Sequence, residues 1–277
     1  MKEDRLLQKL PDGTLDFEHF DKFVHEMRPI QVSVSAAARR FAHRLRRRLM
    51  RARRELYSLR AFVPGLREQH RLEVMVGPLG YWNQLRRYHL RLLCANGLRP
   101  GHTLLDLGCG PLQGGITFIR YLNRGGYTGI DIDPVRVDTA RSQIAQHKLA
   151  GKEPRVFVSS SFGDDELEDS TFDYVWASQV LPYFAAAAMA RLFAMTQRRL
   201  KRDGKFLGDT FAPDHYEFTN PEHPGRYVRH TYESLSTLAA QHGLAVRRLG
   251  MIGDYSYPKR LSLHTNPLFE VTHAGSS

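Results

Sequence analysis

A glycine-rich stretch with an acidic residue in front of it, LLDLGCGPLQGG at residues 104–115, is the part of the sequence best suited to chemistry. Glycine lets the backbone approach a ligand closely, so this density predicts either a tight turn or a binding loop. The G-x-G at Gly108 and Gly110 follows an apolar run that contains Asp106 and precedes a helical pattern. We therefore expect bare backbone N–H groups at a strand-to-helix crevice, where a ligand lies against the main chain.

A second acidic residue favours a nucleotide-like ligand. Asp131 ends the next apolar run, 25 residues after Asp106 (131 minus 106), and an acid about 20 residues from such a loop holds ribose hydroxyls in nucleotide-binding α/β folds. The dinucleotide pattern G-x-G-x-x-G requires a glycine where this chain has Gln113, and the third glycine is displaced to Gly114. An acid before the loop is poorly placed beside a pyrophosphate, so the pattern favours a ribose-bearing ligand with positive charge.

Apolar runs alternate with helical patterns after residue 100, which predicts an α/β fold with a parallel sheet covered on both faces. The expected strands are 102–107, 126–132, 155–160, 172–178 and 204–211, with closing strands at 245–252 and 260–265. The expected helices are 81–98, 113–122, 134–148, 184–200 and 232–244.

Four successive motifs resemble those of class I S-adenosylmethionine-dependent methyltransferases. They are LLDLGCGPLQGG, YTGIDIDP, VFVSSSFGDDELEDSTFDYVWASQVL and LKRDGKFLGDTF. The resemblance covers residues 81–211 well and extends loosely to 265. It implies a Rossmann-like, mostly parallel seven-stranded sheet and S-adenosyl-L-methionine as the cofactor. The variant GPLQGG, preceded by GPLGYWNQLRRYHL, is similar to small-molecule and glycan methyltransferases of polysaccharide or natural-product pathways.

The resemblance also implies a cofactor site built from the ends of four strands. The residues it assigns are Asp106, Gly108, Cys109, Gly110, Asp131, Ile132, Ser160, Ser161, Phe162, Ser178 and Gln179. The glycine loop would face the methionine and ribose part of the cofactor. Asp131 would hold the ribose hydroxyls, Ile132 would pack on the adenine, and the fourth strand would end beneath the sulfonium.

Methyl transfer from a sulfonium requires alignment of the acceptor and, where necessary, removal of its proton. The fourth strand ends in WASQVLPYF and lacks the Asn-Pro-Pro-Tyr of enzymes that methylate nucleobase amines, which argues against a nucleic-acid acceptor. Tyr183 stands near the place where many small-molecule relatives have a histidine. The other catalytic candidates lie at or beyond the end of the fifth strand, in a segment expected to cover the acceptor, and are Asp209, His215 and His230. No metal is expected, since no His-x-x-x-His or paired-cysteine spacing is present.

A basic segment precedes these motifs. The chain of 277 residues has a net charge of +11, and ten arginines fall within 39–60 on an amphipathic helical pattern. Such a helix can lie on anionic lipid, grip a phosphorylated substrate or nucleic acid, or cover the main domain. We expect residues 1–76 to form a basic helical extension (a lid, a dimer arm or a peripheral membrane anchor) and residues 77–277 to form the methyltransferase domain.

The prediction is a cytoplasmic enzyme, because the sequence has neither a membrane span nor a secretory signal. Its expected reaction is O-methylation of a small molecule or glycan, and the arginines suit a phosphorylated or acidic acceptor. Two alternatives stay open: an RNA methyltransferase whose arginine-rich helix tracks phosphates, and a cofactor-binding interaction module without turnover. Homodimerisation through the extension is also open.

Overall fold

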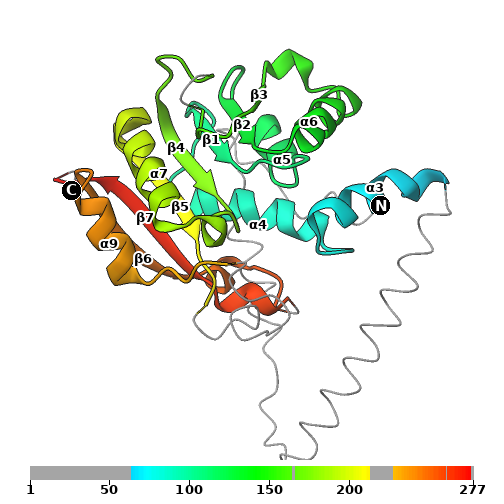
Figure 1. Cartoon of the computed structure of the whole chain (residues 1–277). Coiled ribbons are helices and arrows are strands. Elements are labelled where there is room, and N and C mark those ends of the chain that lie inside the picture. Colours follow the sequence, from blue (N-terminus) through cyan, green and yellow to red (C-terminus); the bar gives the residue numbers. More distant parts are fainter. Residues whose placement is uncertain (1–63, 164–165, 213–226, 260, 276–277) are drawn as a thin grey trace, which may run out of the picture. The chain divides into compact units, whose positions relative to one another are not determined.

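The computed structural model of the chain describes residues 64–163, 166–212, 227–259 and 261–275. These residues form a seven-stranded sheet with the order β3-β2-β1-β4-β5-β7-β6 (Figure 1). The strands are β1 (Leu104–Leu107), β2 (Tyr127–Asp131), β3 (Arg155–Val158), β4 (Phe172–Ala177), β5 (Leu200–Asp209), β6 (Leu244–Met251) and β7 (Pro267–His273). Pairs from β3 to β5 are parallel, and β7 runs antiparallel to both β5 and β6. The predicted Rossmann-like, mostly parallel seven-stranded sheet is confirmed.

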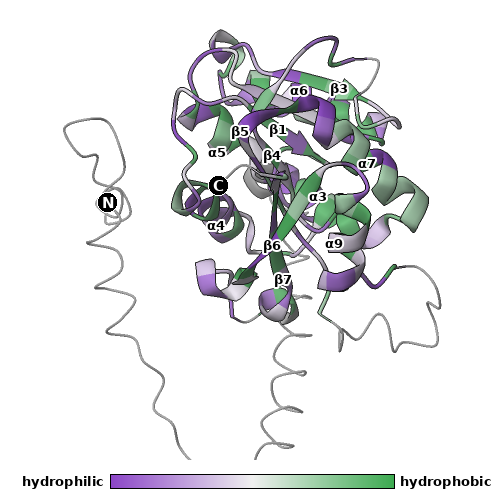
Figure 2. Ribbon diagram, turned by 90° about the vertical axis from the view of Figure 1, so that its left-hand side faces the viewer, coloured by the Kyte–Doolittle hydropathy of each residue, from purple (hydrophilic) through white to green (hydrophobic). Residues whose placement is uncertain are grey.

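Helices cover both faces of the sheet, with α4 and α5 on one side and α7 and α9 on the other (Figure 1). They are α3 (Pro64–Val76), α4 (Trp82–Ala95), α5 (Gly115–Tyr121), α6 (Pro134–Gln146), α7 (Ala186–Arg199) and α9 (Tyr232–Ala240). Figure 2 shows hydrophilic and hydrophobic residues together on the flanking helices, as expected of helices with one face on a core. On the side of α7, the buried Leu192 and Phe193 pack in a cluster with Val175 of β4 and Phe206 of β5.

One predicted strand was wrong. Of the predicted last strand at 260–265, residue 260 lies outside the described residues and residues 262–265 form a 3₁₀ turn, η6 (Ser262–Thr265), which the strand β7 follows. The buried Asn266 explains the shift, because its side chain accepts from the backbone of Ala212 and donates to Asp209, which fixes the turn before the strand.

The strand order reverses between β1 and β4: the chain runs outward from β1 through β2 to β3, then returns to β4 on the other side of β1. Ligands of open α/β sheets bind at the carboxyl ends of strands at such a switch point. The arginine-rich segment 39–60 and His215 lie outside the described residues. Within the described part of the chain, every helix is too short or too polar to cross a membrane.

Candidate active site

A cavity of about 830 Å³ opens at the carboxyl ends of β1, β2 and β4. Its lining brings together most of the predicted site residues: Asp106, Gly108, Cys109, Gly110, Asp131, Ile132, Ser160, Phe162, Ser178, Gln179 and Tyr183. Ser161 is not in the lining. Its backbone amide and hydroxyl contact the hydroxyl of Ser159, and Ser159 does line the cavity. Asp209 and His230 lie behind the lining. Met75 and Val76 also line the cavity, so a domain boundary after residue 76 would divide the lining. That boundary stays a prediction.

The N–H groups of the glycine loop already donate hydrogen bonds within the protein, so the expectation of free backbone donors was wrong. The amides of Gly108 and Cys109 donate to the carbonyl oxygen of Ile130 at 2.8 and 3.0 Å, and the amide of Gly110 donates to Asp131 Oδ2 at 2.9 Å. These bonds fasten the loop to the end of β2. The loop therefore offers no N–H from these three residues to a pyrophosphate, in agreement with a ligand other than a dinucleotide.

Gly108 is required by both backbone and space. Its φ is +68°, and a Cβ built on it would stand 2.5 Å from Cγ2 of Val180. Gly114, the N-cap residue of α5, has an ordinary φ of −86°, and a Cβ there would lie 3.1 Å from the ring of Phe118 and 3.4 Å from that of His89. The first glycine thus serves the turn, and the displaced one serves close packing of α5 against α4.

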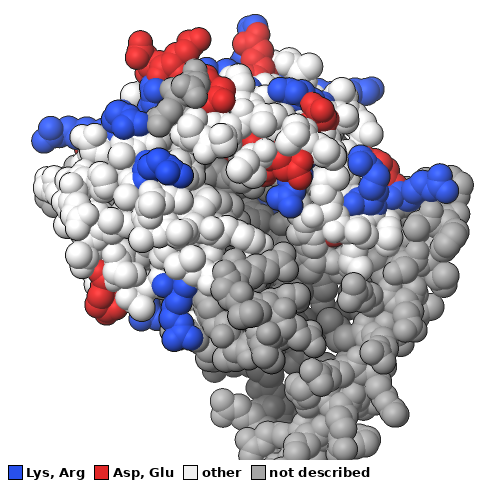
Figure 3. Space-filling view, in the orientation of Figure 1, with Lys and Arg blue, Asp and Glu red and all other residues white. Residues whose placement is uncertain are grey.

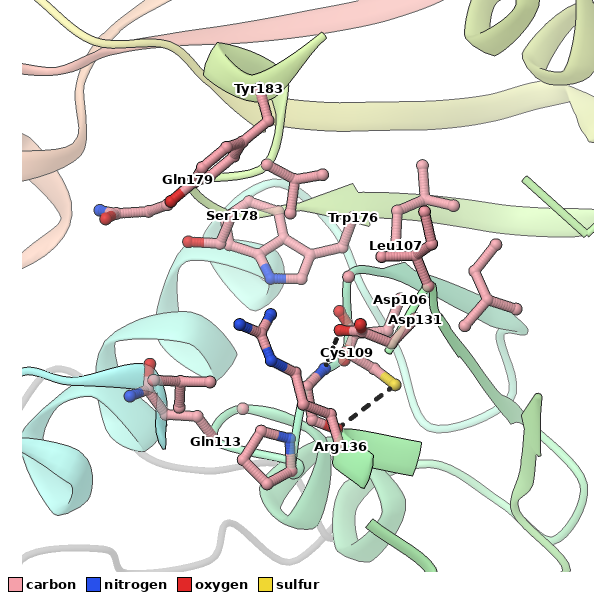
Figure 4. Close-up of a pocket in the computed structure, with 18 of the residues that line it drawn as sticks. Asp106, Leu107, Cys109, Gln113, Asp131, Arg136, Trp176, Ser178, Gln179 and Tyr183 are labelled. Atoms are coloured by element: carbon pink, nitrogen blue, oxygen red, sulfur yellow. Dashed lines mark hydrogen bonds between the residues drawn. The ribbon is translucent and has the colours of Figure 1, made fainter. Parts of the chain in front are cut away.

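Two acids meet at the base of the cavity. Asp106 of β1 and Asp131 of β2 are each 5% exposed and lie close together in Figure 4. Burial raises the pKa of Asp106 to about 7. The hydroxyl of Tyr127 donates to Oδ2 of Asp106 at 2.8 Å and opposes this shift, whereas the charge of Asp131 adds to it. Asp131 accepts from the amides of Gly110 and Asp133, both at 2.9 Å, and its carboxylate retains lone pairs for a ligand.

The wall opposite the acids comes from α3, α4 and the loop between them. Gln113 donates from its Nε2 to the carbonyl oxygen of Gly77 at 2.7 Å, which joins the glycine loop to that inter-helix loop. His89 of α4 is 6% exposed, with Trp176 at a ring distance of 5.6 Å. Burial lowers the pKa of His89 to about 4, and a hydrogen bond with Gln113 opposes this shift, so the imidazole is neutral at pH 7.

Asp209, at the end of β5, lies outside the cavity lining but contacts it through Gln179. It is fully buried, and its Oδ1 accepts from the amide of Gln179 at 2.7 Å while its Oδ2 accepts from Asn266 at 3.2 Å. Burial raises its pKa to about 6, and the hydrogen bonds from Gln179 and Asn266 oppose the shift. Gln179 and Tyr257 both line the cavity. Asp209 therefore positions the surface that a ligand meets without lying on it.

The turn η4 (Leu181–Tyr183) borders the same end of the cavity. Nε2 of His230 lies 3.1 Å from the carbonyl oxygen of Leu181 and 3.0 Å from that of Phe184. Since both partners are acceptors, Nε2 carries the proton, and His230 braces the turn. Tyr183 projects from this turn and is 55% exposed.

Several lining residues were not predicted from the sequence. They are His89, Arg136, Trp176, Arg191 and Tyr257. Arg136 of α6 reaches into the cavity in Figure 4, and Arg191 comes from α7. Tyr257 follows β6 in the sequence and reaches the cavity only when β6 is paired at the edge of the sheet. Only Trp176 lay in a predicted strand, where the apolar pattern indicated burial without a ligand contact.

The described surface carries both signs of charge. On the face seen in Figure 3, Lys and Arg side chains are interspersed with Asp and Glu. No three His, Cys, Asp or Glu side chains of the described residues gather as metal ligands, and the expectation that no metal is used stays a prediction.

Comparison with known proteins places the site in a family. Residues 105–206 match the family model described as a methyltransferase domain. A sterol 24-C-methyltransferase of Schizosaccharomyces pombe is 26% identical over 140 residues, which is 50% of this chain and 36% of that protein. The match thus spans about a third of that relative's length.

Solved structures share the fold. Magnesium protoporphyrin IX methyltransferase of Synechocystis PCC 6803 with bound SAH superposes with a TM-score of 0.55 at 17% identity, over 76% of this chain and 94% of that one. The CcbJ methyltransferase of Streptomyces caelestis gives 0.54 at 14% identity, over 72% and 92%. The matched methyltransferase domain, the seven-stranded sheet and the glycine loop between two acids together support a class I S-adenosylmethionine-dependent methyltransferase, for which S-adenosyl-L-methionine is the cofactor.

Proposed function

We propose that this enzyme transfers a methyl group from S-adenosylmethionine to a hydroxyl group of a small molecule. The observation that carries the proposal is a single cavity with two different ends. One end holds the buried acids Asp106 and Asp131, and the other holds Gln179, Tyr183 and Tyr257. The first end fits a cationic, ribose-bearing cofactor, and the second offers hydrogen bonds and aromatic surface to an acceptor.

The residues at the acidic end fit the cofactor. Asp131 would accept hydrogen bonds from the ribose hydroxyls, and Asp106 would face the ammonium and sulfonium charges. Ile132, which is 70% exposed and lines the cavity, would pack on the adenine beside Ser160 and Phe162. The cofactor supplies an electrophilic methyl group, so the protein's task is to orient the acceptor and exclude water.

The acceptor end performs the orientation. Gln179 and Tyr257 both line the cavity, and the backbone of Gln179 is held beside the end of β4 by Asp209, so these two side chains can hydrogen-bond an acceptor hydroxyl. Asp209 acts as a positioning residue through its bond to the backbone of Gln179. His230 does the same for Tyr183 through the η4 turn. His215 stays a prediction as the residue that accepts the acceptor's proton.

The test joins binding to product analysis. Calorimetry would compare S-adenosylmethionine with NAD on the wild type, on Asp131→Ala and on Asp138→Ala, whose side chain lies on the exposed surface of α6. We expect S-adenosylmethionine alone to bind, with at least tenfold weaker binding in Asp131→Ala and no change in Asp138→Ala. A methyl-labelled cofactor would then be incubated with pools of phenols, sugars and RNA, and the products identified by mass spectrometry.

Each outcome separates the alternatives. Label on the oxygen of a small molecule supports the proposal. Label on RNA supports the RNA methyltransferase, and label on carbon or nitrogen contradicts O-methylation. Cofactor binding with no transfer to any pool favours the non-catalytic module.

A further inference from the structure

The acidic and basic residues that line the cavity differ in their exposure to solvent. Among the described residues, its charged lining consists of Asp106, Asp131, Arg136 and Arg191. The two acids are 5% exposed, whereas the side chain of Arg136 is 39% exposed and Arg191 is an exposed residue. Negative charge therefore lies at the base of the cavity and positive charge at its rim.

The two arginines differ in their partners. Nε of Arg136 lies 3.3 Å from Oδ2 of Asp133, so part of its charge is already compensated within α6. Arg191 takes part in no ion pair with the described residues and lies on α7, three residues after Ala188, which also lines the cavity. Helix positions three apart share a face, and the small side chain of Ala188 leaves room beside the guanidinium. The charge of Arg191 is therefore not compensated by an ion pair within the described residues and is available to a ligand.

An exposed aromatic ring stands at the same end. Tyr183 precedes α7 directly, and its ring meets that of Tyr227 edge-on at 5.0 Å, while Tyr227 meets Phe211 at 4.9 Å. These contacts fix a ring that is still 55% exposed beside the cavity. Phe162 and Phe184, 5.2 Å apart, add further aromatic surface to the lining. Fixed rings of this kind stack on flat apolar ligands at low entropic cost.

We propose that the acceptor is a small aromatic anion, held with its ring against Tyr183 and its acidic group against Arg191. The inference rests on the proposed function, since it names the class of acceptor for the same cavity. The planar guanidinium can bind a carboxylate through two parallel hydrogen bonds, which would set the direction of the ring relative to the methyl group. The acceptor hydroxyl would then lie on the side of Gln179 and Tyr257.

The experiment uses the full chain saturated with S-adenosylhomocysteine, with saturation verified first by calorimetry. The probes are 3,4-dihydroxycinnamate, its uncharged methyl ester, and glucuronate as an anionic sugar. Arg191→Gln removes the charge from the cavity, Tyr183→Leu removes the ring, and Arg87→Gln is the matched control, since Arg87 is exposed on α4 and does not line the cavity.

We expect the cinnamate to bind at least tenfold more tightly than its ester, with the difference lost in Arg191→Gln and kept in Arg87→Gln. Tyr183→Leu should weaken acid and ester alike. Tighter binding of glucuronate, equal binding of acid and ester, or no binding of either aromatic probe to the saturated enzyme would overturn the inference. If S-adenosylhomocysteine itself fails to bind, the proposed function fails instead, and the two failures are thereby distinguished.

Discussion

Asp209 holds the backbone of Gln179 in a conformation that residues other than glycine rarely adopt. The φ of Gln179 is +58°, and its N–H donates to Oδ1 of Asp209 at 2.7 Å. A left-handed backbone at such a residue costs about 1–3 kcal/mol and persists only where the surroundings impose it. Because Gln179 lines the cavity, its hydrogen bond to Asp209 places a polar side chain at the acceptor end.

Replacing Asp209 should therefore impair turnover more than cofactor binding. In Asp209→Ala the amide of Gln179 loses its buried acceptor, and we expect turnover to fall on the order of tenfold or more. S-adenosylmethionine should bind within about threefold of the wild-type affinity, since Asp209 does not line the cavity. Turnover and calorimetry measure the two effects.

Gln179→Gly distinguishes the role of the Gln179 side chain in turnover from the cost of its left-handed backbone. Glycine adopts this φ without steric cost, so the variant should unfold at the wild-type temperature or above while losing turnover in the same way. An equal loss of cofactor affinity in both variants would show that the pair serves the cofactor and would refute the assigned role.

Gly108→Ala should abolish cofactor binding because the new Cβ would stand 2.5 Å from Val180 on a backbone with φ of +68°. Gly125→Ala is the matched control, with φ of +74° and no atom within 4 Å of its Cβ. We expect both to lower stability by about 1 kcal/mol through the backbone, and only Gly108→Ala to add the clash. Thermal unfolding and cofactor titration of the two variants measure the difference, and identical behaviour would exclude the clash.

The cofactor end of the site was predictable because its signals are local. The glycine loop and the acids of β1 and β2 lie next to apolar strands, and parallel strands bring their carboxyl ends to one edge whatever the connections. The fate of the loop amides was not predictable, since Gly108 and Cys109 donate to Ile130, a residue of the neighbouring strand.

The acceptor end was less predictable because non-local contacts build it. Tyr257 follows β6 and reaches the cavity only once the sheet edge has formed, and Arg191 is one arginine among several on a helix whose facing was unknown. His230 had the residue type of a general base, but its distance from the cavity lining depends on how the chain packs against the η4 turn.

That packing predicts a structural effect for His230. His230→Ala should raise the KM for the acceptor by loosening Tyr183 while leaving the affinity for S-adenosylmethionine unchanged. His230→Gln, which can still donate to the carbonyls of Leu181 and Phe184, should recover part of the loss. Burial lowers the pKa of His230 below its ordinary value, and the hydrogen bonds to the carbonyls of Phe184 and Leu181 oppose that shift. A limb of the kcat/KM profile that disappears in both variants would instead make it a base.

Asp106 should make cofactor binding depend on pH. Its pKa of about 7 means that the carboxyl gains its charge as pH rises through neutrality. Because S-adenosylmethionine is cationic, only the ionised form attracts it, and affinity should increase on the order of tenfold between about pH 6 and pH 8. Asp106→Asn should show no such rise, and dividing by its profile removes the titration of the ligand's own amine. Tyr127→Phe deletes the hydrogen bond that lowers the pKa of Asp106, so the midpoint should move to higher pH. Calorimetric titrations across this range measure all three profiles, and a wild-type profile as flat as that of Asp106→Asn would mean that Asp106 does not face the cofactor's charge.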